Sequence, residues 1–387
     1  MISRSERRRI YLDYNATTPL LPEAGQAMRS FLEEEFGNPS SIHSWGRSAR
    51  AAVDSARDQV AAAIGAKSKE IVFTSGGTEA NNLAIFGIAQ ALGKRGRHLV
   101  TCATEHHAVL HPCDRLERDG FEVTRLAVDR HGGLDTGALS RALRPDTILV
   151  SLMSANNETG ACHPLREIGA LCRARGIAFH SDAIQSFGKE VIRVDEWNVD
   201  LLSLAAHKFC GPKGVGALYV RSGQPIQAMQ LGGFHENERR AGTENVAAIV
   251  GMGVAAREAD AHAETENARL MELTEELWTG LERAIPVIQR NGHPSRRLGN
   301  TLNVSFRDCD GASLLMALDL EGICVSSGSA CMVGSVQPSH VLRAMGLDDD
   351  GKAATVRFSP GRASSRKQIP QIIERVQRVV ERLRRNR

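Results

Sequence analysis

Two stretches of the sequence place ligand-binding groups where an apolar run ends. In "FTSGGTEANN", Gly76, Gly77 and Thr78 lie between an expected strand and an expected helix. Glycines let a ligand approach the backbone, and a helix start offers unpaired N–H groups and the positive end of the helix dipole, so the turn suits a phosphate. Tight strand-to-helix turns use the same residues for structural reasons, so this motif alone leaves both interpretations open.

A carboxylate and a lysine follow two further apolar runs. Asp182, in "FHSDAIQSFGK", comes just after an expected strand, where open α/β sheets bind ligands. Its carboxylate needs a cation there, such as a protonated pyridine nitrogen, or else serves as a helix N-cap. Lys208 follows His207 at the end of "LSLAAHK". Burial lowers the pKa of a lysine and yields the free amine that a Schiff base needs, whereas a lysine that points to solvent has no such role.

One cysteine, Cys331, lies in "VSSGSACMVGSVQPSH", a run rich in Ser and Gly. These neighbours favour an exposed loop, so the thiol is either incidental or a nucleophile. His340 is the other titratable side chain of the run. In "TEHHAVLHPC", His107 and His111 have the i, i+4 spacing of a helical metal pair. No HExxH carboxylate or CxxC accompanies them, so zinc is disfavoured against histidine stacking on a flat ring.

The elements expected to position these residues alternate short apolar runs with helix-period segments, which is the pattern of an α/β fold with a mainly parallel sheet. Strands are expected at 70–74, 98–102, 147–153, 176–181, 200–205 and 215–220. A long charged helix is expected from about residue 258, with leucines at 270, 273, 277 and 281 along one stripe. It would connect a large domain, 15–255, to a small α+β domain formed by 1–14 and 256–387.

Composition limits the class of protein. The 387 residues carry a formal net charge of +3, which does not indicate a nucleic-acid surface. No apolar run has membrane-spanning length, and the basic opening "MISRSERRR" is not followed by the apolar stretch of a signal peptide. Eight cysteines without a CxxC pair predict reduced thiols. We therefore expect a cytoplasmic protein.

Taken together, these residues resemble those of fold-type I pyridoxal-phosphate enzymes, specifically cysteine desulfurases of the NifS/IscS type in the class V aminotransferase family. Eleven motifs carry the resemblance in order: "YLDYNATTPL", "FGNPSSIHSWG", "FTSGGTEANNLAI", "TEHHAV", "ANNETG", "SDAIQSFGK", "HKFCGPKGVGALYV", "RAGTEN", "SSGSAC", "PSHVLRAMG" and "VRFSPGR". They cover nearly the whole chain. The resemblance implies a homodimer, a large domain with a mainly parallel seven-stranded sheet, and a small α+β domain that carries the catalytic cysteine loop at about 325–340.

The resemblance also implies roles for individual residues. Lys208 would hold pyridoxal 5'-phosphate as a Schiff base and move protons at the substrate carbon. Asp182 would pair with the pyridinium nitrogen, His106 would stack on the ring, and Gln185 would bond its oxygen. The phosphate is assigned to Gly77, Thr78, His207 and, from the other subunit, Thr243. The substrate carboxylate is assigned to Arg357 and to Asn157, which also contacts the cofactor.

The implied reaction is that of a sulfurtransferase acting on L-cysteine. The thiolate of Cys331 attacks the substrate sulfur, which leaves a persulfide on Cys331 and releases L-alanine. Because only ~3 % of an ordinary thiol is ionised at pH 7, Cys331 needs activation. The sulfur then passes to an acceptor protein, an iron-sulfur scaffold or a tRNA-thiolation enzyme, and Cys331 can transiently ligate a cluster shared with a scaffold. No intrinsic metal, membrane or direct nucleic-acid partner is expected.

Two departures and two alternatives accompany this prediction. Ala205 stands where the family commonly has a serine that bonds the phosphate, and the lost contact is worth about 0.5 to 1.5 kcal/mol. The sequence ends soon after its last expected helix, without the longer tail that docks a scaffold, so the sulfur acceptor is open. The first alternative is an aminotransferase or selenocysteine lyase of the same fold, which would not need Cys331. The second is a non-catalytic thiol and histidine protein that binds metal or sulfur and is colourless.

Overall fold

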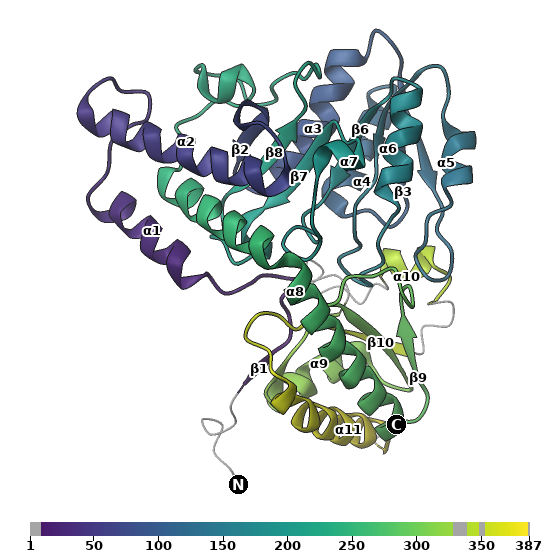
Figure 1. The fold of residues 1–387 in the computed structure, drawn as a ribbon. Helices are drawn as coiled ribbons and strands as arrows, with labels where there is room; N and C mark the ends of the chain where they lie inside the picture. Colours follow the sequence, from purple (N-terminus) through teal and green to yellow (C-terminus); the bar gives the residue numbers. More distant parts are fainter. Residues whose placement is uncertain (1–8, 328–338, 348–352, 386–387) are drawn as a thin grey trace.

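The computed structural model describes residues 9–327, 339–347 and 353–385. These residues form a large body and a smaller one, connected by the long helix α8 (Figure 1). Cys331 and most of its expected loop lie outside the described residues. None of the helices in the described part of the chain is long and apolar enough to span a membrane.

Seven strands form the central sheet of the large body, in the order β2-β8-β7-β6-β5-β3-β4. β8 is antiparallel to both of its neighbours, and the other neighbouring pairs are parallel. The strands are β2 (Ile71–Thr74), β3 (His98–Cys102), β4 (Glu122–Leu126), β5 (Thr147–Ser151), β6 (Ala178–Asp182), β7 (Leu201–Ala205) and β8 (Gly216–Val220). The mainly parallel seven-stranded sheet is therefore confirmed. β4 was missed among the apolar runs because only Leu126 of it is buried.

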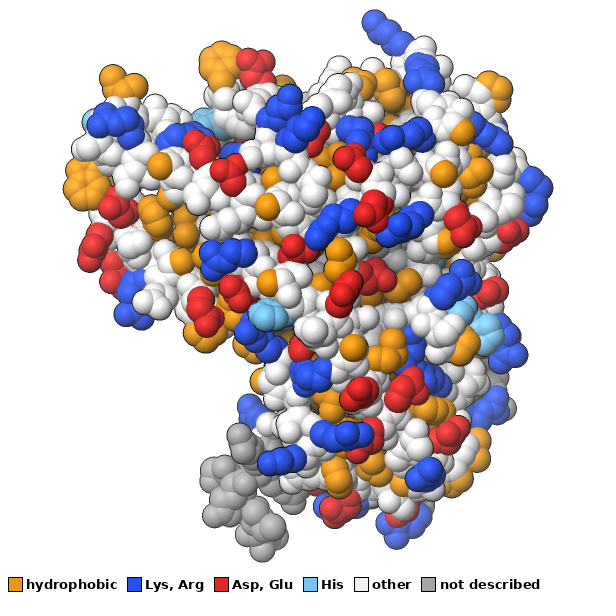
Figure 2. Space-filling view, viewed as in Figure 1, with side chains coloured by type: hydrophobic (Ala, Val, Ile, Leu, Met, Phe, Trp, Pro, Cys, Tyr) orange, Lys and Arg blue, Asp and Glu red, His pale blue; other side chains and the backbone are white. Residues whose placement is uncertain are grey.

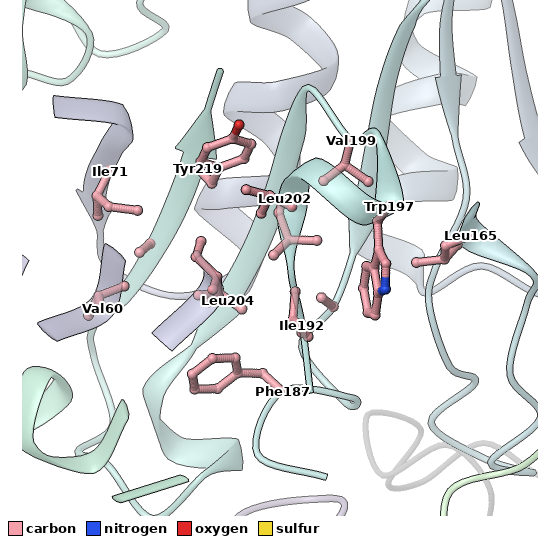
Figure 3. Packing of buried hydrophobic residues seen from close by; sticks show 14 of the residues in the cluster. Val60, Ile71, Leu165, Phe187, Ile192, Trp197, Val199, Leu202, Leu204 and Tyr219 are labelled. Atoms are coloured by element: carbon pink, nitrogen blue, oxygen red, sulfur yellow. The ribbon is translucent and has the colours of Figure 1, made fainter. Parts of the chain in front are cut away.

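Both faces of the sheet are covered by helices, which explains why its strands read as nearly continuous apolar runs. Alternate residues face opposite layers, because side chains alternate along a strand. Leu99, Leu149 and Leu201 pack in one cluster with α3 and α4. Leu202 and Leu204 pack with Tyr219 in the other, which includes α2 and the start of α8 (Figure 3). The helices of this body are α1 (Pro22–Glu33), α2 (Ser44–Ile64), α3 (Gly77–Leu92), α4 (His107–Arg118), α5 (Thr136–Ala142), α6 (Leu165–Ala174) and α7 (Val194–Trp197).

Helix α8 (Val246–Ala284) is 39 residues long and begins before the expected charged segment. Its first part, "VAAIVGMGVAA", is apolar and buried against the large body, so it lacks the amphipathic pattern by which a helix is recognised. Its second part buries the four expected leucines in the core of the small body. α8 thus contributes to both cores.

The small body is built on the antiparallel sheet β12-β10-β9. Its elements are β9 (Ile288–Asn291), β10 (Leu302–Arg307), β12 (Ala353–Phe358), α9 (Gly311–Leu320) and α11 (Ile369–Arg385). The short helix α10 (His340–Ala344) packs instead against Val128 of the large body. β1 (Ile10–Tyr11) pairs with β11 (Ile323–Cys324), so the first described residues belong to this body. The chain then passes from β1 along the seam between the bodies, where it borders the site described below.

Candidate active site

The carboxyl ends of β5, β6 and β7 border a pocket of about 260 Å³. Parallel strands bring their carboxyl ends to one edge of a sheet, which is where such folds bind ligands. The pocket brings together nine of the residues singled out from the sequence: Gly77, Thr78, His106, Asn157, Asp182, Gln185, His207, Lys208 and Arg357.

Lys208 lies in the 3₁₀ turn Ala206–Lys208 (η2) that follows β7. Its Nζ donates to the carbonyl oxygens of Asn15, at 2.5 Å, and Ala16, at 2.9 Å. Both acceptors belong to the segment that follows β1. Two backbone oxygens therefore hold the amine of Lys208 at the pocket.

Asp182 ends β6 with only 6 % of its surface exposed. Its Oδ2 accepts a hydrogen bond from Nδ2 of Asn81 at 2.7 Å, and its Oδ1 accepts one from the backbone N–H of Ile184 at 3.0 Å. The second contact closes a turn within the loop, and no helix starts here, so the N-cap interpretation is wrong. Two carboxylate oxygens offer about four lone pairs, so the group can still meet a cation in the pocket.

Gln185 and Lys189 extend from the turn after β6 into the same region. Nε2 of Gln185 donates to the carbonyl oxygen of Asn15 at 3.0 Å. Its Oε1 is buried and has no hydrogen-bond partner within the described residues. Lys189 donates to the backbone oxygen of Gln185 at 2.7 Å, and burial, reinforced by the charge of Lys208, lowers the pKa of Lys189 to about 8. The pocket floor thus contains an amide that is only partly satisfied.

The end of the pocket formed by α3 has the geometry of an anion site. Gly76 precedes the helix with φ 154° and ψ −176°, a conformation that favours glycine. A Cβ on Gly77 would overlap Cδ1 of Ile184 and would lie 3.3 Å from Cβ of Ala205, so a larger residue here would displace the Ile184 side chain. No side chain caps the helix, and Thr78 is exposed. The first N–H groups of α3 therefore have no side-chain cap and can bind an anion in the pocket.

His207 borders the pocket as a neutral imidazole. Its Nδ1 lies 3.2 Å from Oγ1 of Thr17. Burial, followed by the charges of Lys208 and Lys213, lowers the pKa of His207 to about 4. A neutral ring can still donate one N–H to a phosphate oxygen.

His106 caps helix α4 and is also neutral at pH 7. Its Nδ1 accepts a hydrogen bond from the backbone N–H of Ala108 at 3.0 Å, so its proton resides on Nε2. Burial is the largest cause of its lowered pKa. Beside it, Glu105 is fully buried, which raises the pKa of that carboxyl well above its usual range. His106 therefore contributes a polar ring without a net charge.

Arg357 has 1 % of its surface exposed and reaches the pocket from β12. Its Nη1 donates to the backbone oxygen of Asn157 at 2.9 Å, and its Nη2 donates to Oδ1 of Asp13 at 2.8 Å. The predicted pair Arg357 and Asn157 is thus in direct contact. The guanidinium is oriented by a carboxylate from the opposite end of the chain.

Two predicted site residues are not in the pocket. Thr243 is exposed in the loop before α8 and borders a separate cleft with Arg240 and Glu236. Glu244, its neighbour, pairs with Arg50 of α2 at 2.7 Å. Cys331 lies outside the described residues. Within the described residues, no group of three or more His, Cys, Asp or Glu side chains is arranged to hold a metal ion.

Sequence reasoning missed several polar residues that position the site. They are Asp13, Asn15, Asn81, Glu105 and Lys189. All five lie inside motifs quoted above. Their polar type next to apolar runs was the available signal, but except for Lys189, which bonds Gln185, their partners lie far away in sequence.

The family is decided by comparison with known proteins. The aminotransferase class-V family model matches residues 10–372. The chain belongs to this family. Cysteine desulfurases named IscS match it over nearly their whole length: one from Dictyoglomus turgidum is 50% identical and one from Methanosarcina thermophila 46% identical, each over 98% of this chain and 96% and 94% of the relative. The resemblance to the NifS/IscS type is thereby confirmed.

Solved structures give the same result. A NifS-like protein has a TM-score of 0.91 at 33% identity, covering 96% of this chain and 99% of its own. A structure described as SspA in complex with cysteine has a TM-score of 0.81 at 36% identity, covering 91% and 98%. The fold is therefore that of the fold-type I pyridoxal-phosphate enzymes, as expected.

Proposed function

We propose that this class-V family member is a cysteine desulfurase that removes sulfur from L-cysteine, releases L-alanine and leaves a persulfide on Cys331. The observation that carries the proposal is the pocket that unites Lys208, Asp182 and Arg357 in a chain half identical to proteins named cysteine desulfurase. An amine, a carboxylate and a guanidinium at one edge of the sheet suit an amino acid bound beside a cationic aromatic ring.

The pocket residues fit pyridoxal 5'-phosphate. Oε1 of Gln185 is a buried polar atom without a partner in the described residues, so the amide still has an interaction to make in the pocket. At the start of α3, the backbone of Gly76 has open space around it, and a Cβ on Gly77 would overlap Cδ1 of Ile184. An aromatic ring with a phosphate at one end and a ring nitrogen at the other matches this distribution of groups.

The proposed holding residues are Lys208 at the aldehyde carbon, Asp182 at the ring nitrogen, His106 on the ring face and Gln185 at the ring oxygen. Gly77, Thr78 and His207 would receive the phosphate. The bound cofactor supplies an electron sink for the substrate carbon. Lys208 then moves the proton at that carbon, and Arg357 with Asn157 orients the substrate by its carboxylate.

Several finer proposals follow from the same assignment. We infer a homodimer in which Thr243 reaches the phosphate of the partner subunit. Its exposed position, away from the pocket of its own chain, supports this role. The sulfur acceptor is proposed to be an iron-sulfur scaffold or a tRNA-thiolation enzyme. A cytoplasmic location agrees with the seven free cysteines of the described residues, none of which forms a disulfide.

Mass spectrometry of the cofactor-loaded protein after incubation with L-cysteine tests the proposal. We expect the peptide that contains Cys331 to gain the mass of one sulfur while L-alanine appears. Cys331→Ser should abolish both products, and Cys324→Ser should abolish neither. Alanine formed at the wild-type rate by Cys331→Ser would favour a lyase of the same fold, and absence of a lysine-bound chromophore would exclude the cofactor.

A further inference from the structure

His340 is one of the pocket residues without a role in the proposed function. His340, the first residue of α10, borders the pocket beside His106 and Arg357. Its Nε2 lies 2.9 Å from the carbonyl oxygen of Glu105. A carbonyl oxygen only accepts, so Nε2 carries the proton, and the lone pair of the neutral ring is on Nδ1. No hydrogen bond to this Nδ1 is present within the described residues.

Other basic groups of the pocket accept hydrogen bonds within the protein. Nδ1 of His106 accepts from Ala108, and both oxygens of Asp182 accept from its neighbours. Glu158 accepts from the hydroxyl of Ser339 at 2.5 Å. His340 is therefore a pocket histidine whose Nδ1 has no hydrogen-bond partner within the described residues. His107 also has an unpartnered Nδ1 there, but its ring stacks on that of His111.

His340 lies at the end of the pocket where the substrate carboxylate is proposed to bind. Burial raises the pKa of Glu158, and the hydrogen bond from Ser339 and the charges of His340 and Arg357 oppose that rise. Ser339, which precedes His340, donates to Glu158. Asn157, which precedes Glu158, accepts from Arg357. His340 and Arg357 therefore lie at the same end of the pocket. In an α-amino acid the ammonium is attached to the carbon that carries the carboxylate. Holding the carboxylate at Arg357 consequently places the ammonium in the same part of the pocket.

We propose that Nδ1 of His340 is the base that accepts a proton from the α-ammonium group of the incoming amino acid. The N–H bond of the ammonium breaks, its electron pair stays on the substrate nitrogen, and the proton forms an N–H bond at Nδ1. The amine becomes the nucleophile that exchanges with Lys208, and the imidazolium later returns its proton to solvent. The inference rests on the proposed function in one respect, namely that the substrate is an amino acid.

The residues around His340 allow its imidazole to gain and lose a proton. On α4, the ring of His107 lies 4.6 Å from that of His340 and 4.8 Å from that of His111, centroid to centroid. Burial first, then the neighbouring histidines, lowers the pKa of His107, so it stays neutral. Glu105 presents its carbonyl while its buried carboxyl keeps a raised pKa. Asp13 is the acidic group that pairs with Arg357, and Glu158 accepts from Ser339.

Amine exchange with L-alanine tests this role without any sulfur chemistry. The cofactor-loaded protein is mixed with L-alanine in a stopped-flow spectrometer, and the visible absorbance change is followed from pH 6 to pH 10, roughly the range over which an imidazole and an amine ionise. In His340→Gln the amide can still donate to Glu105, but the base is lost. We expect exchange to slow by ~10²-fold at low pH, the lower end of general base catalysis. The difference in exchange rate between His340→Gln and the wild type should disappear at high pH, where the ammonium of L-alanine loses its proton without a protein base.

Two controls make the outcome decisive. His111→Gln, the same change in the same histidine cluster, should keep the wild-type rate at every pH. Added imidazole should partly restore the exchange rate of the His340→Ala protein. In the cofactor-free protein, ¹⁵N NMR should show His340 protonated on Nε2. The proposal would be overturned if His340→Gln exchanged as fast as the wild type, or if it were slower by the same factor at every pH. It would also be overturned if His340 carried its proton on Nδ1. Because L-alanine lacks sulfur, these results stand apart from the persulfide test.

Discussion

At the scale of single residues, Ala205 tests how the pocket holds a phosphate. It is buried at the end of β7, borders the pocket and faces Gly77, whose Cβ would lie 3.3 Å from that of Ala205. Ala205→Ser introduces a hydroxyl at this end. One hydrogen bond to a phosphate is worth about 0.5 to 1.5 kcal/mol, so cofactor dissociation should slow by roughly two- to tenfold. Loss of visible absorbance during dialysis measures the rate.

The control at the same position is Ala205→Val, which adds volume without a hydrogen-bonding group. Overpacking against Gly77 and Ile184 should speed cofactor loss or leave it unchanged. If serine and valine have the same effect, the hydroxyl is not what matters, and the phosphate is held by the backbone of α3 and by the side chains already assigned.

Residue types could be predicted where chemistry and strand ends coincide. Asp182 and Lys208 each follow an apolar run, and parallel strands necessarily end at one edge, so their meeting followed from sequence. The hydrogen-bond partners of the site residues could not be predicted in this way. Asn15 bonds Lys208 across 193 positions and Asp13 bonds Arg357 across 344, and no local pattern encodes such distances. These contacts became visible only in the structure, where the N-terminal segment runs between the two bodies.

At the scale of elements, α8 decides how the two bodies are coupled. We propose the domain division at about residue 255, within this helix, and the separate cores on either side support it. The pattern of leucines revealed only the second part of the helix, because a helix buried on most sides shows no polar stripe. With the proposed division, the boundary would lie inside a helix and not in a linker.

Leu277→Ala tests this division. Leu277 is 2 % exposed in the small core, so its truncation should cost about 2 to 5 kcal/mol of stability. We expect denaturant to unfold the small body earlier, as seen by far-ultraviolet circular dichroism, while cofactor absorbance from the large body is lost at the wild-type concentration. Glu272→Ala, on the exposed side of α8, should change neither transition by more than about 0.5 kcal/mol. A single transition shared by both signals would show one cooperative unit.

At the scale of the whole molecule, the exposed apolar side chains of the large body support the homodimer. Hydrophobic side chains gather over α1 and α2 at the upper left of Figure 2. Phe36 and Trp45 stack there with ring centroids 5.0 Å apart, and Phe36 is 79 % exposed. Leu231 and Phe234 are 84 % and 86 % exposed in the loop that leads to Thr243. Exposed apolar groups of this kind often mark protein–protein interfaces, so a second copy is their proposed occupant.

Phe234→Asp should therefore convert a dimer to a monomer in sedimentation velocity, because a charge would be buried at the interface. The monomer should also lose pyridoxal 5'-phosphate faster, since Thr243 of the partner subunit would no longer reach the phosphate. Thr243→Ala should speed cofactor loss while the dimer persists, which separates the contact from the assembly. Met316→Asp, at an apolar residue 63 % exposed on the small body, serves as the matched control and should remain dimeric. A wild-type protein that sediments as a monomer and still retains its cofactor would refute both the interface and the role of Thr243 in trans.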